Sequence, residues 1–188
     1  MKKGLLIILS GPSGVGKGTV RKVVMEDESL DLAYSISMTT RKPRNMEQNG
    51  VDYFFVTHEE FKENLEKDNL LEHAFFVGNY YGTPKDYVEK LRNEGKNVIL
   101  EIEIEGATQV MEKCKGDRTF SIFLIPPSLE ALEARIRGRK SETEEVIHER
   151  LEKAKREMGL KDRYDYVVLN DDVNRASNEI RDIIKSRL

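Results

Sequence analysis

The sequence predicts an α/β protein of three layers, in which helices cover both faces of a central parallel sheet. Four apolar runs are continuous rather than alternating, which is typical of strands buried on both faces. These runs lie at 5–9, 97–103, 119–125 and 166–169. Stretches with helical spacing separate them, at 19–26, 106–113, 129–138, 142–158 and 173–187. Because strands and helices alternate along the chain, the strands are expected to be parallel.

The segment at about 34–83 differs from the rest and predicts a small β-rich insertion. Its short aromatic runs are bounded by turn residues such as Asn49-Gly50. The runs lie at 34–37, 53–56 and 72–77. A second insertion, charged and helical, is expected at about 135–150. We therefore expect a single domain over residues 1–188, with a core formed by 1–33, 84–134 and 151–188.

The composition argues against several kinds of partner. The 31 basic and 34 acidic residues nearly cancel, giving a net charge of −3, so no general basic field attracts nucleic acid or an anionic membrane. No apolar stretch reaches the roughly 20 residues that a membrane helix needs. The apolar run after Met1-Lys2-Lys3 is too short for a secretory signal. Cys114 is the only cysteine, which excludes an intrachain disulfide and favours a cytoplasmic location.

A glycine-rich loop between the first strand and the first helix predicts a phosphate-binding site, and hence a P-loop fold. The loop reads Gly11-Pro12-Ser13-Gly14-Val15-Gly16-Lys17-Gly18-Thr19. Backbone N–H groups in such a loop surround phosphate oxygens, and glycines permit the positive φ angles that this requires. Lys17 is expected to reach the β and γ phosphates of ATP. Gly18 stands where the common pattern has Ser or Thr, and Thr19 supplies a hydroxyl one position later. Mg²⁺ is therefore expected to be held mainly by phosphate oxygens and water, not by a loop hydroxyl.

Other motifs along the chain resemble those of the guanylate kinase family. Ser37-Met38-Thr39-Thr40-Arg41-Lys42-Pro43-Arg44, followed by Gly50-Val51-Asp52-Tyr53-Phe54, resembles the GMP-binding segment of that family. The resemblance continues in the expected order through Glu72, 78–83, 101–103, 135–150 and 168–172. It implies that the insertion at about 34–83 is a GMP-binding subdomain and that 135–150 is a short helical lid.

The resemblance also implies which residues bind GMP. The phosphate of GMP would be held by Arg41, Arg44, Tyr53 and Tyr81, and arginine suits this role because its donors are planar and fixed. The base would be contacted by Ser37, Glu72 and Thr83, since a carboxylate can accept both N–H donors on one edge of guanine. Glu103 would be a second acidic residue, besides Glu72, in the GMP-binding site. The family usually has Asp-x-Asp where this chain has Glu101-Ile102-Glu103, so a contact from Glu103 through water is expected.

The same resemblance implies which residues act on ATP. The ATP-binding residues would be the loop Gly11 to Thr19 with Arg135, Arg139 and Asn170, the last beside the adenine ring. Glu101, at the end of a buried strand, would hold Mg²⁺ through water. Preorganised cations stabilise the charge that spreads over a transferring phosphoryl group. The catalytic residues would therefore be Lys17, Arg41, Arg135, Arg139 and Arg150.

Together these features imply an enzyme of purine nucleotide metabolism that transfers the γ-phosphoryl group of ATP to GMP, and to dGMP, with Mg²⁺. Two alternatives remain open. One is another small-molecule kinase on the same core, such as an adenylate kinase or a ribose-bisphosphate kinase, against which Ser37, Glu72 and the Arg41/Arg44 pair argue. The other is a non-enzymatic guanylate-kinase-like scaffold that binds phosphorylated peptides, against which the intact Lys17 argues. The oligomeric state, monomer or homodimer, is left open.

Overall fold

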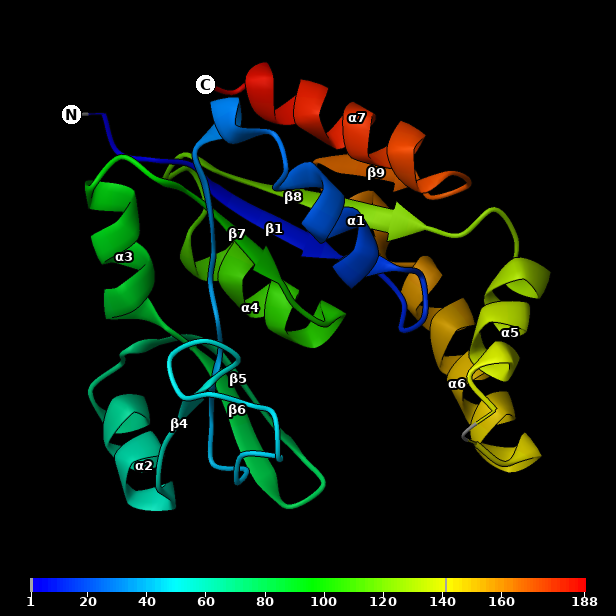
Figure 1. Ribbon diagram of the computed structural model, residues 1–188, viewed down its shortest axis with the longest axis horizontal. Coiled ribbons are helices and arrows are strands. Elements are labelled where there is room, and N and C mark those ends of the chain that lie inside the picture. The colour runs from blue at the N-terminus through cyan, green and yellow to red at the C-terminus, as the bar shows by residue number, and fades with distance from the viewer. Residues whose placement is uncertain (1, 141) are drawn as a thin grey trace.

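A five-stranded parallel sheet forms the centre of the molecule (Figure 1). The structure is a computed structural model that describes residues 2–140 and 142–188; Ser141, in the predicted lid, lies outside the described residues. The strands follow the order β2 (Leu32–Tyr34), β7 (Asn97–Glu101), β1 (Leu6–Ser10), β8 (Thr119–Ile125) and β9 (Tyr166–Leu169). All four pairings are parallel, so the predicted fold class is confirmed.

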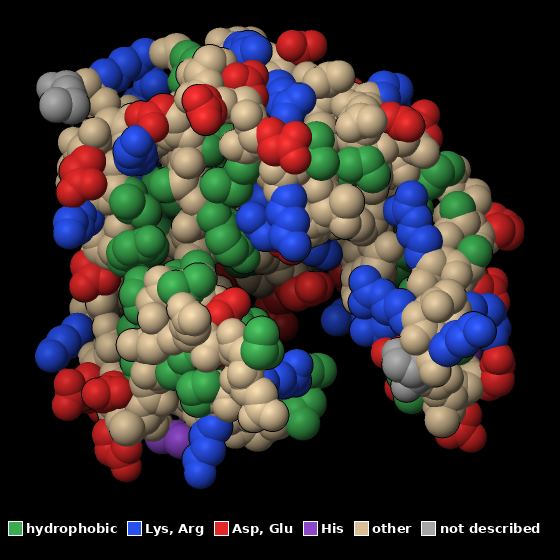
Figure 2. Space-filling view, viewed as in Figure 1, with side chains coloured by type: hydrophobic (Ala, Val, Ile, Leu, Met, Phe, Trp, Pro, Cys, Tyr) green, Lys and Arg blue, Asp and Glu red, His purple; other side chains and the backbone are tan. Residues whose placement is uncertain are grey.

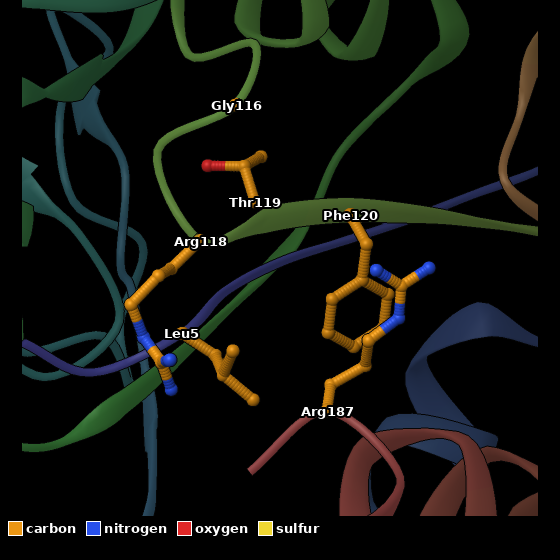
Figure 3. Close-up of a pocket in the computed structure, with 6 residues that line it drawn as sticks. All are labelled: Leu5, Gly116, Arg118, Thr119, Phe120 and Arg187. Atoms are coloured by element: carbon orange, nitrogen blue, oxygen red, sulfur yellow. The ribbon is translucent and has the colours of Figure 1, made fainter.

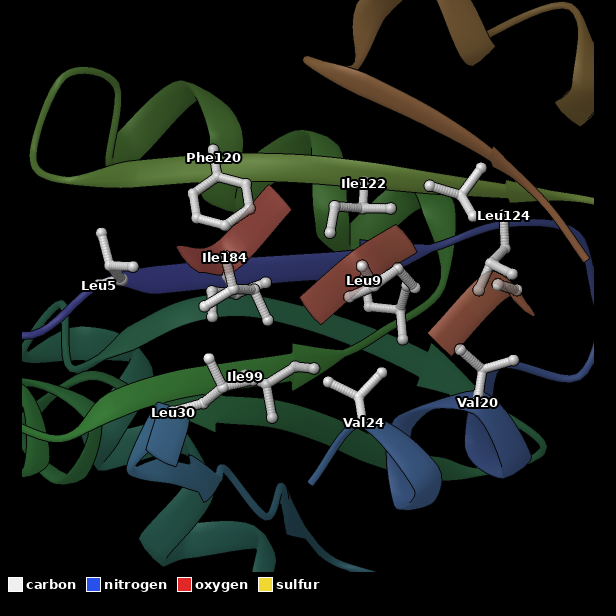
Figure 4. Packing of buried hydrophobic residues seen from close by; sticks show 14 of the residues in the cluster. Leu5, Leu9, Val20, Val24, Leu30, Ile99, Phe120, Ile122, Leu124 and Ile184 are labelled. Carbon is white, nitrogen blue, oxygen red and sulfur yellow. The ribbon is translucent and has the colours of Figure 1, made fainter. Parts of the chain in front are cut away.

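Helices cover both faces of this sheet because its strands are apolar on both sides. Alternate residues of β1 enter two separate cores, with Ile7 and Leu9 in one and Leu6 and Ile8 in the other. The first core is closed by α1 (Lys17–Val24) and α7 (Val173–Lys185), and Figure 4 shows Val20 and Ile184 in it, around Leu9. The second core is closed by α3 (Lys85–Asn93) and α4 (Ile104–Lys113).

A second, four-stranded sheet lies beside the core, in the stretch predicted to be β-rich. Its strands follow the order β4 (Phe54–Phe55), β3 (Met38–Thr39), β6 (Asn79–Pro84) and β5 (Leu70–Phe76). Helix α2 (His58–Glu66) packs on it through Phe61, which contacts Met38 and Leu70 in a small apolar cluster. Strand β5 lies at one edge of this sheet and pairs only with β6 among the described strands.

A helical pair projects from the other side of the core (Figure 1). It consists of α5 (Leu129–Gly138) and α6 (Glu144–Met158), which meet through Leu132, Ile136, Ile147 and Ala154. Short 3₁₀ turns at Glu28–Leu30 and Lys161–Arg163 complete the described elements. None of the helices in the described ranges combines the length and apolarity needed to cross a bilayer.

Several predicted boundaries are wrong. The strand expected at 34–37 does not form, because Tyr34 instead ends β2 and pairs in the main sheet. Helices α1 and α4 begin two residues earlier than expected, and the strand expected at 97–103 ends at Glu101. Helices α2 and α3 were not predicted, since each is nine residues long and mostly polar. The division into core, GMP-binding subdomain and lid stays a prediction.

Candidate active site

The phosphate loop, residues 11–19, joins β1 to α1 and is held by its own lysine. Gly14 and Gly16 adopt φ angles of 86° and 97°, which residues with a side chain rarely adopt. Lys17 is the first residue of α1 and is only 8% exposed. Its ammonium group donates to the carbonyl oxygens of Gly11 at 2.8 Å and Pro12 at 3.3 Å. The cation predicted to meet a phosphate is therefore already directed into the loop.

Two predicted ATP-binding residues fasten the outer side of this loop. The carbonyl oxygen of Val15 accepts hydrogen bonds from the guanidinium of Arg135 and from the amide Nδ2 of Asn170, both at 2.8 Å. A Cβ atom on Gly16 would lie 2.9 Å from that same Nδ2 atom. Asn170 follows β9 and Arg135 lies on α5, so the loop is braced by two elements far away in sequence. The structure thus brings Lys17, Arg135 and Asn170 together.

Glu101, the predicted Mg²⁺ residue, ends β7 beside the start of α1. Its carboxylate pairs with Arg21 at 2.6 Å, and the Arg21 guanidinium lies 3.8 Å from the centre of the Tyr34 ring. A Cβ atom on Gly18 would lie 3.3 Å from the other Glu101 oxygen. The absence of a side chain at position 18 and the long carboxylate at position 101 are therefore two parts of one packing arrangement. Sequence reasoning missed Arg21, because nothing in the loop motif indicates it.

Glu103 connects the loop to helix α4. It is the residue before the first turn of α4, and its carboxylate lies 3.8 Å from the Lys17 ammonium. The Glu103 side chain is largely exposed, so this contact is weak in water. A ligand phosphate could therefore take the place of Glu103 as the partner of Lys17 at little cost.

Glu72, the predicted reader of guanine, is a buried carboxylate on β5. It is 6% exposed and accepts a hydrogen bond from the Thr83 hydroxyl at 2.8 Å. Burial raises the pKa of Glu72 above its ordinary value, only partly offset by the Thr83 hydrogen bond. In the described residues no Lys or Arg forms an ion pair with it. Ser37, the third predicted base contact, is half-buried, and its carbonyl accepts a hydrogen bond from the Phe54 amide.

The four predicted contacts to the GMP phosphate form an arginine–tyrosine cluster, consisting of Arg41, Arg44, Tyr53 and Tyr81. The Arg41 guanidinium lies 5.3 Å from the centre of the Tyr53 ring, and the Tyr53 and Tyr81 ring centres are 6.2 Å apart. The pKa of Arg41 is raised chiefly by its hydrogen bonds with Glu47, with a smaller contribution from Tyr81. The Arg44 side chain is exposed. Three of the four predicted side chains are thus brought together, and Arg44 lies on the neighbouring turn.

Glu47 belongs to this cluster but was not predicted. Its two carboxylate oxygens accept from both terminal nitrogens of Arg41 at 2.8 Å, and one of them also accepts from the Arg44 backbone amide at 2.8 Å. The Arg41 guanidinium lowers the pKa of Glu47 to about 2, and the same hydrogen bonds raise the pKa of Arg41. The signal in the sequence was an acid three residues after Arg44 and six after Arg41.

The remaining predicted lid arginines lie away from the loop. Arg150 pairs with Glu142 at 2.9 Å, and Arg139 is exposed. Neither makes a hydrogen bond or ion pair with the phosphate loop within residues 2–140 and 142–188. Only Arg135 of the three reaches it. A movement of the α5–α6 pair would be needed to bring Arg139 and Arg150 to the same place.

A hollow separates the second sheet from the α5–α6 pair. Figure 2 shows it open to solvent, with acidic side chains at its inner wall and Lys and Arg side chains on the α5–α6 side. A different pocket, of about 270 Å³, lies elsewhere on the main sheet, where Arg187 lies against Phe120 and Arg118 lies beyond Leu5 (Figure 3). None of the predicted site residues lines that pocket. The hollow lies between the second sheet and the α5–α6 pair, the two parts that carry the predicted GMP-binding residues and lid arginines, so it is the candidate active site.

Comparisons with known proteins show which family this chain is similar to. A family model described as guanylate kinase matches residues 3–187. The chain is 55% identical over 184 residues to a guanylate kinase of Mycoplasma capricolum, covering 98% of this chain and 61% of that protein. It is 58% identical over 183 residues to a guanylate kinase of Bacillus cereus, covering 97% of this chain and 88% of that protein. A crystal structure of guanylate kinase from Anaplasma phagocytophilum matches with a TM-score of 0.75 and 32% identity, over 98% of this chain and 86% of that one.

Proposed function

This chain belongs to the guanylate kinase family, and from that premise we propose that it transfers the γ-phosphoryl group of ATP to GMP, giving ADP and GDP. The family membership and the enzyme class predicted from the sequence are confirmed by the relatives described above. Phosphorylation of GMP by ATP is the activity that these relatives support. We extend the proposal to dGMP as a second acceptor.

One observation carries the proposal: a single turn of helix α4 joins the phosphate loop to the buried carboxylate. Glu103, just before that turn, lies 3.8 Å from the Lys17 ammonium. Gly106, within the turn, lies against the Glu72 carboxylate. One helical turn rises only about 5.4 Å. A triphosphate at Lys17 and a purine base at Glu72 would therefore be held at the two ends of one helical turn.

The base site favours guanine on chemical grounds. Glu72 is buried, accepts one hydrogen bond from Thr83, and has no ion-pair partner among the described residues. A buried carboxylate of this kind is stabilised by further hydrogen-bond donors. Guanine presents two N–H donors on one edge, and adenine does not. We propose that Ser37, Glu72 and Thr83 contact the base, with Glu103 reaching GMP through water.

Phosphate binding on the acceptor side would use the arginine–tyrosine cluster. Arg41 has five N–H donors, and three hydrogen bonds from them already go to the Glu47 carboxylate and the Lys42 carbonyl. The remaining donors, the Arg44 side chain, and the hydroxyls of Tyr53 and Tyr81 would hold the phosphate dianion. Because that phosphate is already anionic, the transfer requires no strong general base.

On the donor side, Lys17 would exchange its two loop carbonyls for phosphate oxygens of ATP, and Asn170 would lie beside the adenine ring. Arg135 lies at the loop already, whereas Arg139 and Arg150 would reach the transferring group when the α5–α6 pair closes. Closure would expel water, which competes as an acceptor. The rate enhancement would then come from positioning and from cations directed at the developing charge.

The residues near the loop suit Mg²⁺ bound chiefly through ATP. The described residues contain no group of three or more His, Cys, Asp or Glu side chains arranged to hold a metal. Glu101 supplies a carboxylate beside the start of α1, and Mg²⁺ commonly takes one or two carboxylates plus phosphate oxygens and water. We propose that Glu101 holds Mg²⁺ through water. The ion would neutralise charge on the phosphates.

We propose that the protein acts in the cytoplasm on small-molecule substrates, without nucleic acid or membrane partners. The near balance of 31 basic and 34 acidic residues and the single Cys114 support this.

The experiment that tests the proposed function measures ADP formation from ATP and Mg²⁺ with GMP, dGMP, AMP, CMP or UMP offered separately. Turnover with GMP and dGMP, and its loss in Lys17→Ala, is the expected result. Turnover with AMP in preference to GMP would contradict the assignment of Glu72 and leave the phosphate loop intact. An absence of turnover with every acceptor would favour the scaffold alternative.

A further inference from the structure

Helix α4 presents a row of residues to strand β5 beside the Glu72 carboxylate. Gly106, Gln109 and Lys113 are spaced three and four residues apart, so they share one face of the helix. Each contacts a different position of β5. Because β5 is an edge strand of the second sheet, its outer backbone groups need partners from elsewhere.

Gly106 lies directly against the guanine reader. A Cβ atom at this position would be 2.6 Å from Oε2 of Glu72, 3.1 Å from its Cδ and 3.3 Å from its Cγ. Gly106 is buried inside a regular helix, where glycine is less favourable than alanine. Its φ is not in the left-handed region, so backbone freedom does not explain the residue. The Glu72 carboxylate fills the space that a side chain at position 106 would occupy, and this explains why the residue is glycine.

Gln109 fixes the backbone next to Glu72. Its Oε1 accepts from the His73 amide at 3.1 Å, and its Nε2 donates to the His73 carbonyl at 3.0 Å. One side chain thus replaces the pair of hydrogen bonds that a neighbouring strand would make with His73. One turn further along, the Lys113 ammonium donates to the Leu70 carbonyl at 2.9 Å. The pairing of β5 with β6 is irregular between Leu70 and Glu72, so this part of β5 depends on α4 for its position.

We propose that Gly106 and Gln109 are specificity-determining positioning residues, which set where the Glu72 carboxylate stands and thereby the preference for a guanine base. The proposal rests on the proposed function above. Gly106 acts by leaving room for the carboxylate, and Gln109 acts by holding the strand that carries it. Since α4 begins beside Lys17, the same helix sets the position of the base relative to the phosphate loop.

Gly106→Ala is the sharpest test, because the atom that it crowds is the end of a flexible side chain. The fold can relieve the crowding by displacing the carboxylate, and alanine favours the helix, so the variant is expected to fold. We expect the Kd and KM for GMP to rise about tenfold, the KM for ATP to stay within about twofold, and the ratio of GMP to AMP turnover to fall. Gln109→Ala is expected to raise the KM for GMP about three- to tenfold with the same KM for ATP.

Two further variants separate positioning from general damage. Glu112→Ala places alanine at an exposed position of the same helix and is expected to change neither constant. In a Glu72→Asp background, whose carboxylate is one methylene shorter, Gly106→Ala is expected to have a smaller additional effect than in the wild type. Additive effects of the two substitutions would contradict direct crowding of the carboxylate.

The measurements are GMP affinity by calorimetry, steady-state kinetics with each acceptor, and thermal unfolding of every variant. Wild-type protein that neither binds nor phosphorylates GMP would overturn the proposed function, and this inference with it. Wild-type turnover of GMP, combined with a GMP affinity within twofold of wild type in Gly106→Ala, would overturn this inference alone. Equal losses toward GMP and ATP would also overturn it, since they would indicate a general structural role.

Discussion

The phosphate loop and the arginine–tyrosine cluster are both proposed to hold phosphate, yet they are built from different parts of the chain. The loop is a continuous run of nine residues whose donors are mainly backbone N–H groups. The cluster is assembled from side chains of residues 41–81, half-buried or exposed, and it is oriented by a carboxylate. One proposed phosphate site is therefore formed by a continuous stretch of sequence, and the other by residues that only the tertiary structure brings together.

The difference extends to how each site is held without a ligand. Lys17 is 8% exposed and satisfied by carbonyl oxygens of its own loop, which is braced by Arg135 and Asn170. Arg41 is instead satisfied by Glu47, whose charge resembles that of a phosphate. Changes in the loop are therefore expected to cost most of the activity, and changes around the cluster to cost less.

The largest effect is expected for Lys17→Met, which keeps the apolar stem of the side chain and removes its charge. Because no other described Lys is directed into the loop, kcat with GMP is expected to fall about 10²–10³-fold or more. The measurement is steady-state kinetics, with thermal unfolding to show that the variant remains folded. A kcat within tenfold of wild type would mean that the backbone N–H groups of the loop are sufficient at the ATP site without the Lys17 charge.

A smaller, selective effect is expected for Glu72→Gln. The amide retains the shape of the side chain but loses the charge that strengthens hydrogen bonds to guanine, so kcat/KM for GMP is expected to fall about 10- to 100-fold. The KM for ATP should not change, because the phosphate loop is separate. A parallel loss for ATP would place Glu72 in the general architecture rather than in base reading.

The same variant gives a pH test of burial. Because burial raises the pKa of Glu72, the folded state favours the protonated carboxyl. Its contribution to stability is therefore fully present below the unfolded pKa, near 4.5, and is lost as the pH rises through the higher folded pKa. We expect the unfolding free energy of Glu72→Gln, relative to wild type, to rise across that window, as measured by thermal unfolding from pH 4 to 8. A difference independent of pH would contradict the burial of the charge.

The sequence predicted the main sheet well because its strands are buried on both faces. No polar residue interrupts the apolar pattern in the runs Leu6 to Leu9 and Val98 to Leu100. Helix α2 was missed because Phe61 is its only buried residue, although the capping box of Thr57 and Glu60 marks its start. The boundary at Tyr34 was missed because an isolated three-residue strand carries no periodicity, and only pairing with β7 assigns it.

Site residues were predictable where a motif is contiguous and not where a residue acts through a distant one. The loop residues and Lys17 follow from a single run of sequence. Glu47 and Gly106 do not, since one matters through Arg41 and the other through the volume of Glu72.

Glu47→Gln sharpens the comparison at the cluster. The amide cannot pair as strongly with Arg41, so the guanidinium is less well oriented, and the KM for GMP is expected to rise about two- to fivefold with the KM for ATP unchanged. Because the pKa of Glu47 is lowered to about 2, its charge persists in neutral solution, and the effect should be the same from pH 5 to 8. A lower KM for GMP would instead mean that Glu47 only competes with the GMP phosphate.

The smallest effect is expected at Gly18, where the loop departs from the common pattern. Gly18→Ser restores the hydroxyl but places a Cβ atom 3.3 Å from one carboxylate oxygen of Glu101. The other oxygen of Glu101 is paired with Arg21 at 2.6 Å, so the carboxylate can move away only slightly. We expect Gly18→Ser to raise the KM for ATP about two- to threefold, and to raise it less in a Glu101→Asp background, because the shorter acid leaves room. The measurement is a double-mutant cycle on the KM for ATP at saturating Mg²⁺. If the two effects are independent, the contact between positions 18 and 101 does not explain the glycine, and the loop tolerates a hydroxyl there for reasons unrelated to Glu101.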